Sequence, residues 1–508
     1  MQAAKKVALN TGITYARMIL TMGISLYSTR IVLNALGSID YGIFNLIAGI
    51  VAMLSFLNVA MTASTQRYLS YHQGGKDVQM QVKVFTNSFL LHILIGIIVV
   101  VCLEIAGFFL FDGFLNIPVD KIPVAKTIFH FMSVTVFFTI MSVPLTALLN
   151  AHENMIVIAV VGLIEVLLKL AIALSLLVIL TNKLFFFGIL TASLSIFTFA
   201  MFAFYCFRKY QECTLRGVFD YDKKLISELT SFAGWNLFGT ICSLGRTQGL
   251  AILLNIFFGA TINAAYGIAN QVAAQLNFFS ATLLQALNPQ IMKSEGAGDR
   301  ARMLKLSMMA SKFGFFLLAF IAIPAVFEMK SILTFWLSNV PDYTVVFCQL
   351  ILIATLANQL TIGVQSGLQA TGRIKLYQMV VGTTILMNVP ISYMLLKIGF
   401  PAHSVLLSFI GIELTACCLR LYFLKSIAGL VIRNYIERVF LKELIPIITI
   451  VLVSYFFTTV LKGFNYRFLL TITGASISFV ISIYFTGFCK DEKELLVQFA
   501  SKIRNKIK

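Results

Sequence analysis

Residues 14–37 read TYARMILTMGISLYSTRIVLNALG, and this stretch is long and apolar enough to cross a membrane as one helix. The same stretch contains two arginines, Arg17 and Arg30. Insertion scales assign a cost of about 2.5–3.5 kcal/mol to a charged side chain at the centre of a membrane helix. Charge that is retained in such a helix therefore indicates a functional site.

The composition of the whole chain agrees with this stretch. Of the 508 residues, 59% are hydrophobic and only 12% are charged, whereas an ordinary soluble domain contains about 25% charged residues. A chain with so little charge must expose apolar surface to lipid, and no polar stretch is long enough to form a separate soluble domain. We therefore predict an all-α polytopic membrane protein.

A membrane helix needs about 20 mostly apolar residues, and runs of this kind divide the chain into about fourteen expected spans. The expected spans are residues 11–36, 41–66, 84–111, 127–149, 155–181, 184–207, 229–258, 263–288, 306–327, 343–370, 376–397, 402–424, 443–461 and 467–488.

The lysines and arginines between these spans predict the orientation. When the N-terminus is placed inside, the inner connections and the two tails contain most of the lysines and arginines that lie outside the spans. The positive-inside rule then predicts that both termini face the cytoplasm. The net charge of +18 is explained by this topology and by attraction to anionic membrane lipids, and not by binding to nucleic acid.

Two parts of the chain about 225 residues apart are alike, which indicates an internal repeat. Tyr41-Gly42-Ile43 matches Tyr266-Gly267-Ile268, and about 220 residues separate a further matching pair, Val161-Gly162 and Val381-Gly382. Both copies begin at the same membrane face, so we predict two parallel-repeat six-helix lobes plus two C-terminal helices. Alternating-access transporters carry their substrate between such repeats.

The expected domains are the N-lobe 1–207, a cytoplasmic linker 208–228, the C-lobe 229–424, helices 13–14 in 425–488 and an amphipathic cytoplasmic tail 489–508.

Three arginines within the spans are the predicted substrate-binding residues. Arg246 lies near the middle of 229–258, too deep to reach an interface, so it should face a cavity, an anion or a buried acid. With an offset of about 225 residues its counterpart is Thr21, one turn from Arg17. We predict that Arg246, Arg17 and Arg30 bind an anion. The alternatives are structural pairing for Arg246 and, for Arg17 and Arg30, extension of the side chain to an interface.

Charged residues at other depths are candidates for ion coupling. Glu165 and Lys169 are spaced i, i+4, so an internal salt bridge is the alternative to a coupling role. Glu413 and Glu104 are further acids within spans, without an evident partner. We predict that Glu165, Lys169, Glu413 and Glu104 contribute to coupling with a proton or sodium. Lys312 lies near the inner end of its span and is expected to reach the interface.

The sequence offers no candidate metal or catalytic centre. None of the eight cysteines forms a CxxC pair, and the five histidines are scattered without metal-ligand spacing on one helix. We expect no metal, no cofactor and no catalytic residue. A membrane-embedded enzyme of polysaccharide synthesis is a weak alternative, because the longest outer connection, near 112–126, shows no catalytic constellation.

Five segments together are similar to one known family. They read NALGSIDYGIFN (34–45), STQRYLSYHQG (64–74), FAGWNLFGTICSLGRTQGLAILLNIFFG (232–259), NAAYGIANQV (263–272) and NPQIMKS (288–294). The chain resembles the bacterial polysaccharide flippases for O-antigen and capsule, which belong to the multidrug/oligosaccharidyl-lipid/polysaccharide exporter (MOP) superfamily. The resemblance covers nearly the whole chain and is densest in helices 1–2 and 7–8.

This resemblance implies a transporter of lipopolysaccharide or capsule biosynthesis in the bacterial cytoplasmic (inner) membrane. It implies two lobes in a V that open alternately, and a substrate of undecaprenyl pyrophosphate bearing an oligosaccharide, moved from the inner to the outer leaflet. The family tends to have a cationic central cavity, and the positions that match this pattern are Arg17, Arg30 and Arg246. The expected partners are this lipid-linked oligosaccharide, membrane lipids and a coupling ion. The main alternative is a multidrug or cation exporter of the same superfamily, which the absence of acids from residues 11–36 disfavours.

Overall fold

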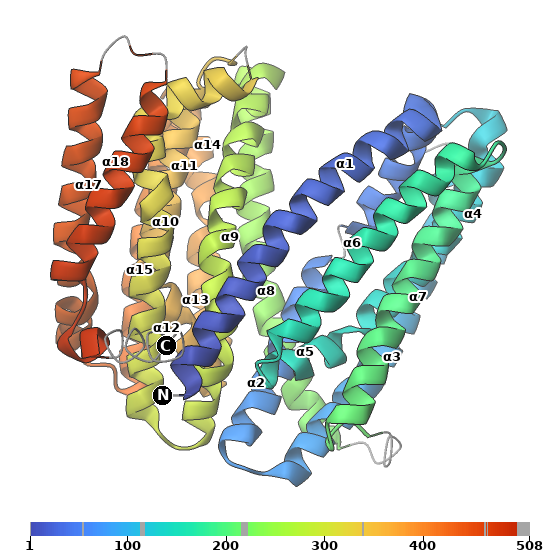
Figure 1. Cartoon of the computed structure of the whole chain (residues 1–508), viewed down its shortest axis with the longest axis horizontal. Helices are drawn as coiled ribbons and strands as arrows, with labels where there is room; N and C mark the ends of the chain where they lie inside the picture. Colours follow the sequence, from blue (N-terminus) through green and yellow to red (C-terminus); the bar gives the residue numbers. More distant parts are fainter. Residues whose placement is uncertain are drawn as a thin grey trace, which may run out of the picture. The chain divides into compact units, whose positions relative to one another are not determined.

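The computed structural model describes residues 2–52, 55–111, 117–214, 222–337, 340–461, 464 and 466–494. Within these ranges the chain forms helices and no strand (Figure 1). The helices are α1 (Gln2–Ala52), α2 (Ser55–Gly74), α3 (Val78–Phe109), η2 (Val119–Lys121), α4 (Ile122–Met141), α5 (Val143–Ala151), α6 (Met155–Val178), α7 (Lys183–Lys209), α8 (Lys223–Phe258), α9 (Ala260–Gly296), α10 (Arg300–Leu337), α11 (Thr344–Gln359), α12 (Ile362–Thr371), α13 (Lys375–Leu386), α14 (Asn388–Lys397), α15 (Ser404–Ala428), α16 (Ile432–Tyr435), η3 (Ile436–Phe440), α17 (Leu441–Val460), α18 (Arg467–Ser482) and η4 (Ile483–Gly487).

The predicted multi-pass membrane protein is confirmed. In the described part of the chain, ten helices are long and apolar enough to cross a membrane, and the bent pair α11 and α12 makes an eleventh span. The remaining three expected spans fall on α1, on the second part of α1 with α2, and on α9.

The chain divides into two compact units, which we call the N unit (Lys6–Leu237) and the C unit (Phe238–Lys508 with Met1–Lys5). The boundary falls inside α8 and not at the predicted linker 208–228, of which residues 215–221 lie outside the described ranges. Most of the amphipathic tail expected at 489–508 also lies outside them.

A glycine ends the first span of each unit in the same backbone conformation. Gly37 interrupts α1 with φ 78° and ψ 170°, and Gly259 separates α8 from α9 with φ 81° and ψ −174°. A side chain would be strained at this positive φ, so glycine is the residue that fits. The two glycines turn the chain from one span into the next.

A second pair of residues with positive φ lies at equivalent turns of the two units, one between α2 and α3 and the other between α9 and α10. Lys76 and Gly298 precede matching aspartates, Asp77 and Asp299, each of which accepts a backbone N–H three residues on as an N-cap. Both Gly37/Gly259 and Lys76/Gly298 are 222 residues apart. The backbone therefore corrects the offset of about 225 residues that the sequence motifs suggested for the first spans.

That correction changes the expected match between the arginines. With an offset of 222 residues, Arg246 matches Ile24 and not Thr21. Arg17 is then two helical turns from the counterpart of Arg246, so the two arginines do not occupy nearly matching positions in the repeat. The motif Tyr41-Gly42-Ile43 misled the alignment because it recurs one helical turn out of step with the glycine turn.

Each unit has its own apolar core. In the N unit, Ile47 of α1, Phe129 of α4 and Leu184 of α7 belong to one buried cluster. In the C unit, α17 and α18 pack against each other and against α10 (Figure 1), where Phe316 and Phe479 make an edge-to-face contact. The last two membrane helices are thus an integral part of the C unit.

Candidate functional site

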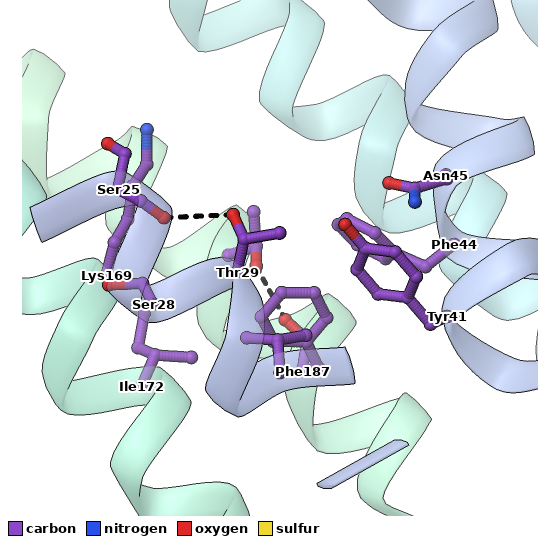
Figure 2. Close-up of a pocket in the computed structure, with 11 residues that line it drawn as sticks. Ser25, Ser28, Thr29, Tyr41, Phe44, Asn45, Lys169, Ile172 and Phe187 are labelled. Carbon is purple, nitrogen blue, oxygen red and sulfur yellow. Dashed lines mark hydrogen bonds between the residues drawn. The ribbon is translucent and has the colours of Figure 1, made fainter. Parts of the chain in front are cut away.

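The N unit contains a pocket of about 340 Å³ between α1, α6 and α7 (Figure 2), which we call the polar pocket after the hydroxyl, amide and ammonium groups among its otherwise apolar lining. The lining residues from α1 are Ser25, Ser28, Thr29, Val32, Tyr41, Phe44 and Asn45. Those from α6 and α7 are Lys169, Ile172, Phe187 and Thr191.

The local sequence explains how α1 lines this pocket twice. Ser25, Ser28 and Thr29 recur at i, i+3 and i+4, so they share one helical face. The turn at Gly37 then brings Asn45 to the opposite wall, where Figure 2 shows its amide directed toward the other lining residues. The hydroxyls of Ser28 and Thr29 donate to backbone carbonyls four residues back, at 2.8 Å and 2.9 Å, so they are satisfied within the helix.

One cation lines this pocket, and it belongs to a row of alternating charges on α1 and α6. The Nζ atom of Lys169 lies 2.7 Å from Oε1 of Glu165, so the salt bridge weighed as the alternative for this pair is present. Glu165 also interacts electrostatically with Arg17. We call Arg17, Glu165 and Lys169 the N triad; it contains two positive charges and one negative charge. The Lys169 and Glu165 side chains are 50% and 34% exposed.

A glycine on α6 makes room for Arg17. A Cβ atom at Gly162 would lie only 2.9 Å from Nε and 3.0 Å from Cζ of Arg17, so a larger residue would displace the guanidinium. Nη1 of Arg17 lies 3.4 Å from the carbonyl oxygen of Ile158. The predicted cation of the first span is thus held along α6, beside the carboxylate of Glu165.

The C unit holds a second carboxylate between two cations. Nη1 of Arg246 donates to Oε1 of Glu413 at 2.6 Å, and Nη2 of Arg420 lies 3.7 Å from Oε2. Asn358 donates to the same Oε2 at 2.9 Å. The Arg246 guanidinium also stacks 3.8 Å from the centre of the Phe409 ring. We call Arg246, Glu413 and Arg420 the C triad.

The two triads differ in the exposure of their side chains. The side chains of Arg246, Glu413 and Arg420 are 8%, 2% and 3% exposed. The structure therefore supplies the buried acid that was one of the alternatives for Arg246. The predicted substrate contact of Arg246 stays a prediction, since Glu413 occupies its Nη1 atom in this conformation.

Two predicted site residues lie apart from both triads. Arg30 is exposed on α1, and it is not among the residues that line the polar pocket. Oε2 of Glu104 lies 2.7 Å from Nδ1 of His130, so Glu104 has a partner that the sequence did not reveal. Glu104 and His130 line a smaller cavity of about 140 Å³ between α3 and α4.

The comparisons with known proteins find structures but no sequence relative. No family model and no curated protein matches the chain. A crystal structure of MATE in the bent conformation matches with a TM-score of 0.75 and 10% identity, over 86% of this chain and 97% of that chain. MATE transporter ClbM in complex with Rb⁺ matches with a TM-score of 0.69 and 13% identity, over 85% of this chain and 96% of that chain.

A MOP superfamily transporter from Pyrococcus furiosus matches with a TM-score of 0.70 and 12% identity, over 84% of this chain and 95% of that chain. For that protein, a reverse polarity of the binding pocket is said to suggest a different function. This chain has the MATE transporter fold. At these identities the likeness establishes the fold of MATE and MOP superfamily transporters, and the substrate of this chain must be argued from its own residues.

Within this MATE-like fold, sequence analysis missed several site residues. It did not single out Arg420, which is near the end of the expected span 402–424; α15 continues to Ala428 and buries this side chain. It also missed the polar face formed by Ser25, Ser28 and Thr29. Their i, i+3, i+4 spacing was a usable signal, although hydroxyl residues at this spacing also occur where helices pack together. Among the described residues, no group of three or more His, Cys, Asp or Glu side chains could hold a metal ion.

Proposed function

We propose that this protein is a flippase that moves undecaprenyl-pyrophosphate-linked oligosaccharide from the inner to the outer leaflet of the bacterial cytoplasmic membrane by alternating access. The observation that supports this proposal most directly is the polar pocket of the N unit, where Lys169 is the charged lining residue and no described lining residue is acidic. A pocket with this charge suits an anionic headgroup.

In the proposed mechanism the N triad replaces water around the pyrophosphate. Lys169 reaches the pocket, while Glu165 holds the ammonium group in place at 2.7 Å. The Asn45 amide supplies N–H donors for phosphate oxygens, whereas the hydroxyls of Ser28 and Thr29, which donate within their own helix, offer lone pairs to sugar hydroxyls. Because Glu165 offsets part of the positive charge, the headgroup is attracted without being held so tightly that release stalls.

The roles proposed for the other predicted residues follow from their surroundings. Arg17 adds positive potential behind Glu165, and Arg30 attracts the headgroup from its exposed position on α1. A substrate contact for Arg246 requires a second conformation in which Glu413 releases it. Glu165 is the proposed coupling carboxylate of the N unit, because its protonation would free Lys169 for the anion.

A multidrug or cation exporter is the second candidate function. It is favoured by the structural likeness to MATE transporters, one of which was solved in complex with Rb⁺. An organic cation would need an unpaired carboxylate in its binding pocket. In this chain Glu165 is bonded to Lys169 and is not among the described residues that line the polar pocket.

The proposal can be tested in a bacterial strain that lacks this protein. We expect lipid-linked oligosaccharide to accumulate on the cytoplasmic leaflet, and wild-type protein and Lys169→Arg to restore surface glycan. Lys169→Met should restore little, whereas Lys83→Met, which removes an exposed lysine of α3, should restore it fully. Membrane levels of each variant serve as the control for expression. Normal surface glycan with altered drug tolerance in the deletion strain would favour the exporter.

A further inference from the structure

A buried charge cluster lies outside the proposed transport site, where α10, α17 and residues 489–494 of the C unit meet. Lys312 of α10 was expected to extend to the interface, but its side chain is only 1% exposed. Its Nζ atom donates to Oε2 of Glu492 at 2.5 Å and lies 3.7 Å from Sγ of Cys489. The segment 489–494 is thus anchored to α10 by a buried ion pair.

Glu492 also organises the segment to which it belongs. Its Oε2 atom accepts the backbone N–H of Cys489 at 2.7 Å, which is the reach-back contact of a capping box at the start of a short helix. Its side chain is 7% exposed. Weakening the bond to Lys312 would therefore loosen both the anchor and the turn that presents Glu492.

A second carboxylate is buried beside this ion pair and lacks a partner. Glu443 of α17 is 1% exposed, and neither of its carboxyl oxygens has a hydrogen-bond partner among the described residues. Lys312 interacts with it electrostatically. One lysine thus faces two buried carboxylates, so the cluster has one negative charge too many unless a carboxylate holds a proton. A buried unpaired carboxylate is costly, and protonation removes that cost.

Within the described ranges, the other cations near Glu443 are already paired with other acids. Tyr435 of α16 interacts with it and donates its hydroxyl to the carbonyl of Leu360 at 2.7 Å. Arg438 of η3 and Lys305 of α10 both bond to Asp491. The described groups around the cluster are Ser311, Lys312 and Lys305 of α10, Cys417 and Arg420 of α15, Tyr435 of α16, Arg438 of η3, and Cys489, Asp491 and Glu492 of the terminal segment. Arg420 is paired with Glu413 of the C triad.

We propose that Glu443 is a proton-binding site and that its proton permits the segment 489–494 to dock on α10 through Lys312 and Glu492. When Glu443 is protonated, Lys312 is free to bond Glu492 alone. When Glu443 is ionised, it competes for Lys312 and weakens the anchor. Docking and protonation are therefore linked, and each favours the other. A proton fits better than a metal cation, because the proton is taken up into a neutral O–H group, whereas a metal cation would keep its positive charge beside the Lys312 ammonium.

Cys489 reports on docking directly, because it lies in the anchored segment. We would replace the exposed Cys102 and Cys418 with serine and measure the rate of maleimide labelling of Cys489 from about pH 6 to about pH 9. The rate for the protein with Glu443 is divided by the rate for Glu443→Gln at the same pH, which cancels the pH dependence of the thiol itself. We expect this ratio to be near one at low pH and to rise about fivefold or more with increasing pH.

Control variants separate the proposal from a folding defect. Glu443→Met also lacks an ionisable group and should label as slowly as Glu443→Gln, provided that both elute as folded protein. Glu492→Gln should label rapidly at every pH, since it removes the charge that anchors Lys312. A labelling ratio that stays near one across the range, or slow labelling of Glu492→Gln, would overturn the proposal. A rise in the ratio that disappears when choline replaces sodium would indicate a sodium site and overturn it as well.

Discussion

The N triad and the C triad contain the same charges in different surroundings. Each places one glutamate between two cations, Arg17 and Lys169 in the N unit and Arg246 and Arg420 in the C unit. The N triad reaches a polar pocket through Lys169. The C triad is enclosed by Asn358, Phe409 and its own helices. The difference in burial is the reason that we propose binding for the charges of the N unit and internal structure for those of the C unit.

The helix that carries Lys169 shows how the surroundings differ. The counterpart of Lys169 in the C unit, at the offset of 220 residues between Gly162 and Gly382, is Val389. A Cβ atom at Gly249 would lie 2.8 Å from Cγ2 of Val389, so the two helices are in close apolar contact there. Where the N unit has a pocket and a lysine, the C unit has a packed interface. This asymmetry favours the N unit as the site of the anionic headgroup.

The largest effect expected from this comparison follows from removing the carboxylate of the C triad. Glu413→Gln leaves Arg246 and Arg420 buried without their counter-charge, and breaking a buried ion pair in this way costs about 3–5 kcal/mol. We expect a correspondingly large loss of unfolding free energy, measured by denaturant titration in detergent. The matched exposed change is Glu437→Gln, which breaks the surface pair with Arg433 and should leave the unfolding free energy nearly unchanged. Equal losses for the two variants would contradict the structural role of the C triad.

Replacing the matching glycines Gly162 and Gly382 with alanine should change the unfolding free energy less than Glu413→Gln does. A Cβ atom at Gly382 would lie 3.1 Å from the Phe238 ring and 3.3 Å from Sγ of Cys242, so Gly382→Ala should cost about 1–3 kcal/mol through overpacking. At Gly162 the nearest group is the movable end of Arg17. Gly162→Ala should therefore cost less stability but lower transport, because it displaces Arg17 from Glu165. Thermal unfolding and flipping assays on both variants would check this contrast, and the reverse ranking of stabilities would break it.

The pair of Glu212 with His152 lies in the N unit outside its membrane spans. It should make the unfolding free energy depend on pH by about 1 kcal/mol. Burial alone would raise the pKa of Glu212, but the hydrogen bonds from His152, a backbone N–H and Gln73, together with the charge of His152, outweigh it and hold the pKa below its usual value. A lowered pKa stabilises the fold above the unfolded pKa, and this contribution is lost as the pH falls through the folded pKa. Wild-type stability should therefore decrease below about pH 4.5, and His152→Gln should show a smaller decrease. An unchanged acid profile in His152→Gln would exclude this account.

The sequence predicted the fold class because its signals are local. Apolar runs specify membrane helices, and the motifs around Tyr41 and Tyr266 revealed the repeat. The offset was wrong by one helical turn, since side-chain motifs do not record backbone conformation as Gly37 and Gly259 do. The pairing of Glu165 with Lys169 was accessible because both lie on one helix.

The partners of Arg246 and Lys312 were not accessible from the sequence. Glu413 and Glu492 are 167 and 180 residues away along the chain, and only the tertiary structure brings Glu413 to Arg246 and Glu492 to Lys312. Arg420 shows the same limit, because the positive-inside rule counts a cation near a helix end without stating whether its side chain is buried.

The measurement that tests the central claim most directly is binding of a short isoprenoid pyrophosphate to the purified protein, compared with an organic cation of similar size. We predict that the pyrophosphate binds to wild-type protein and to Lys169→Arg, and that Lys169→Met weakens this binding about tenfold or more, as loss of a charge-assisted hydrogen bond implies. The organic cation should bind poorly to all three. Strong binding of the cation, with no effect of Lys169→Met on the pyrophosphate, would contradict the account.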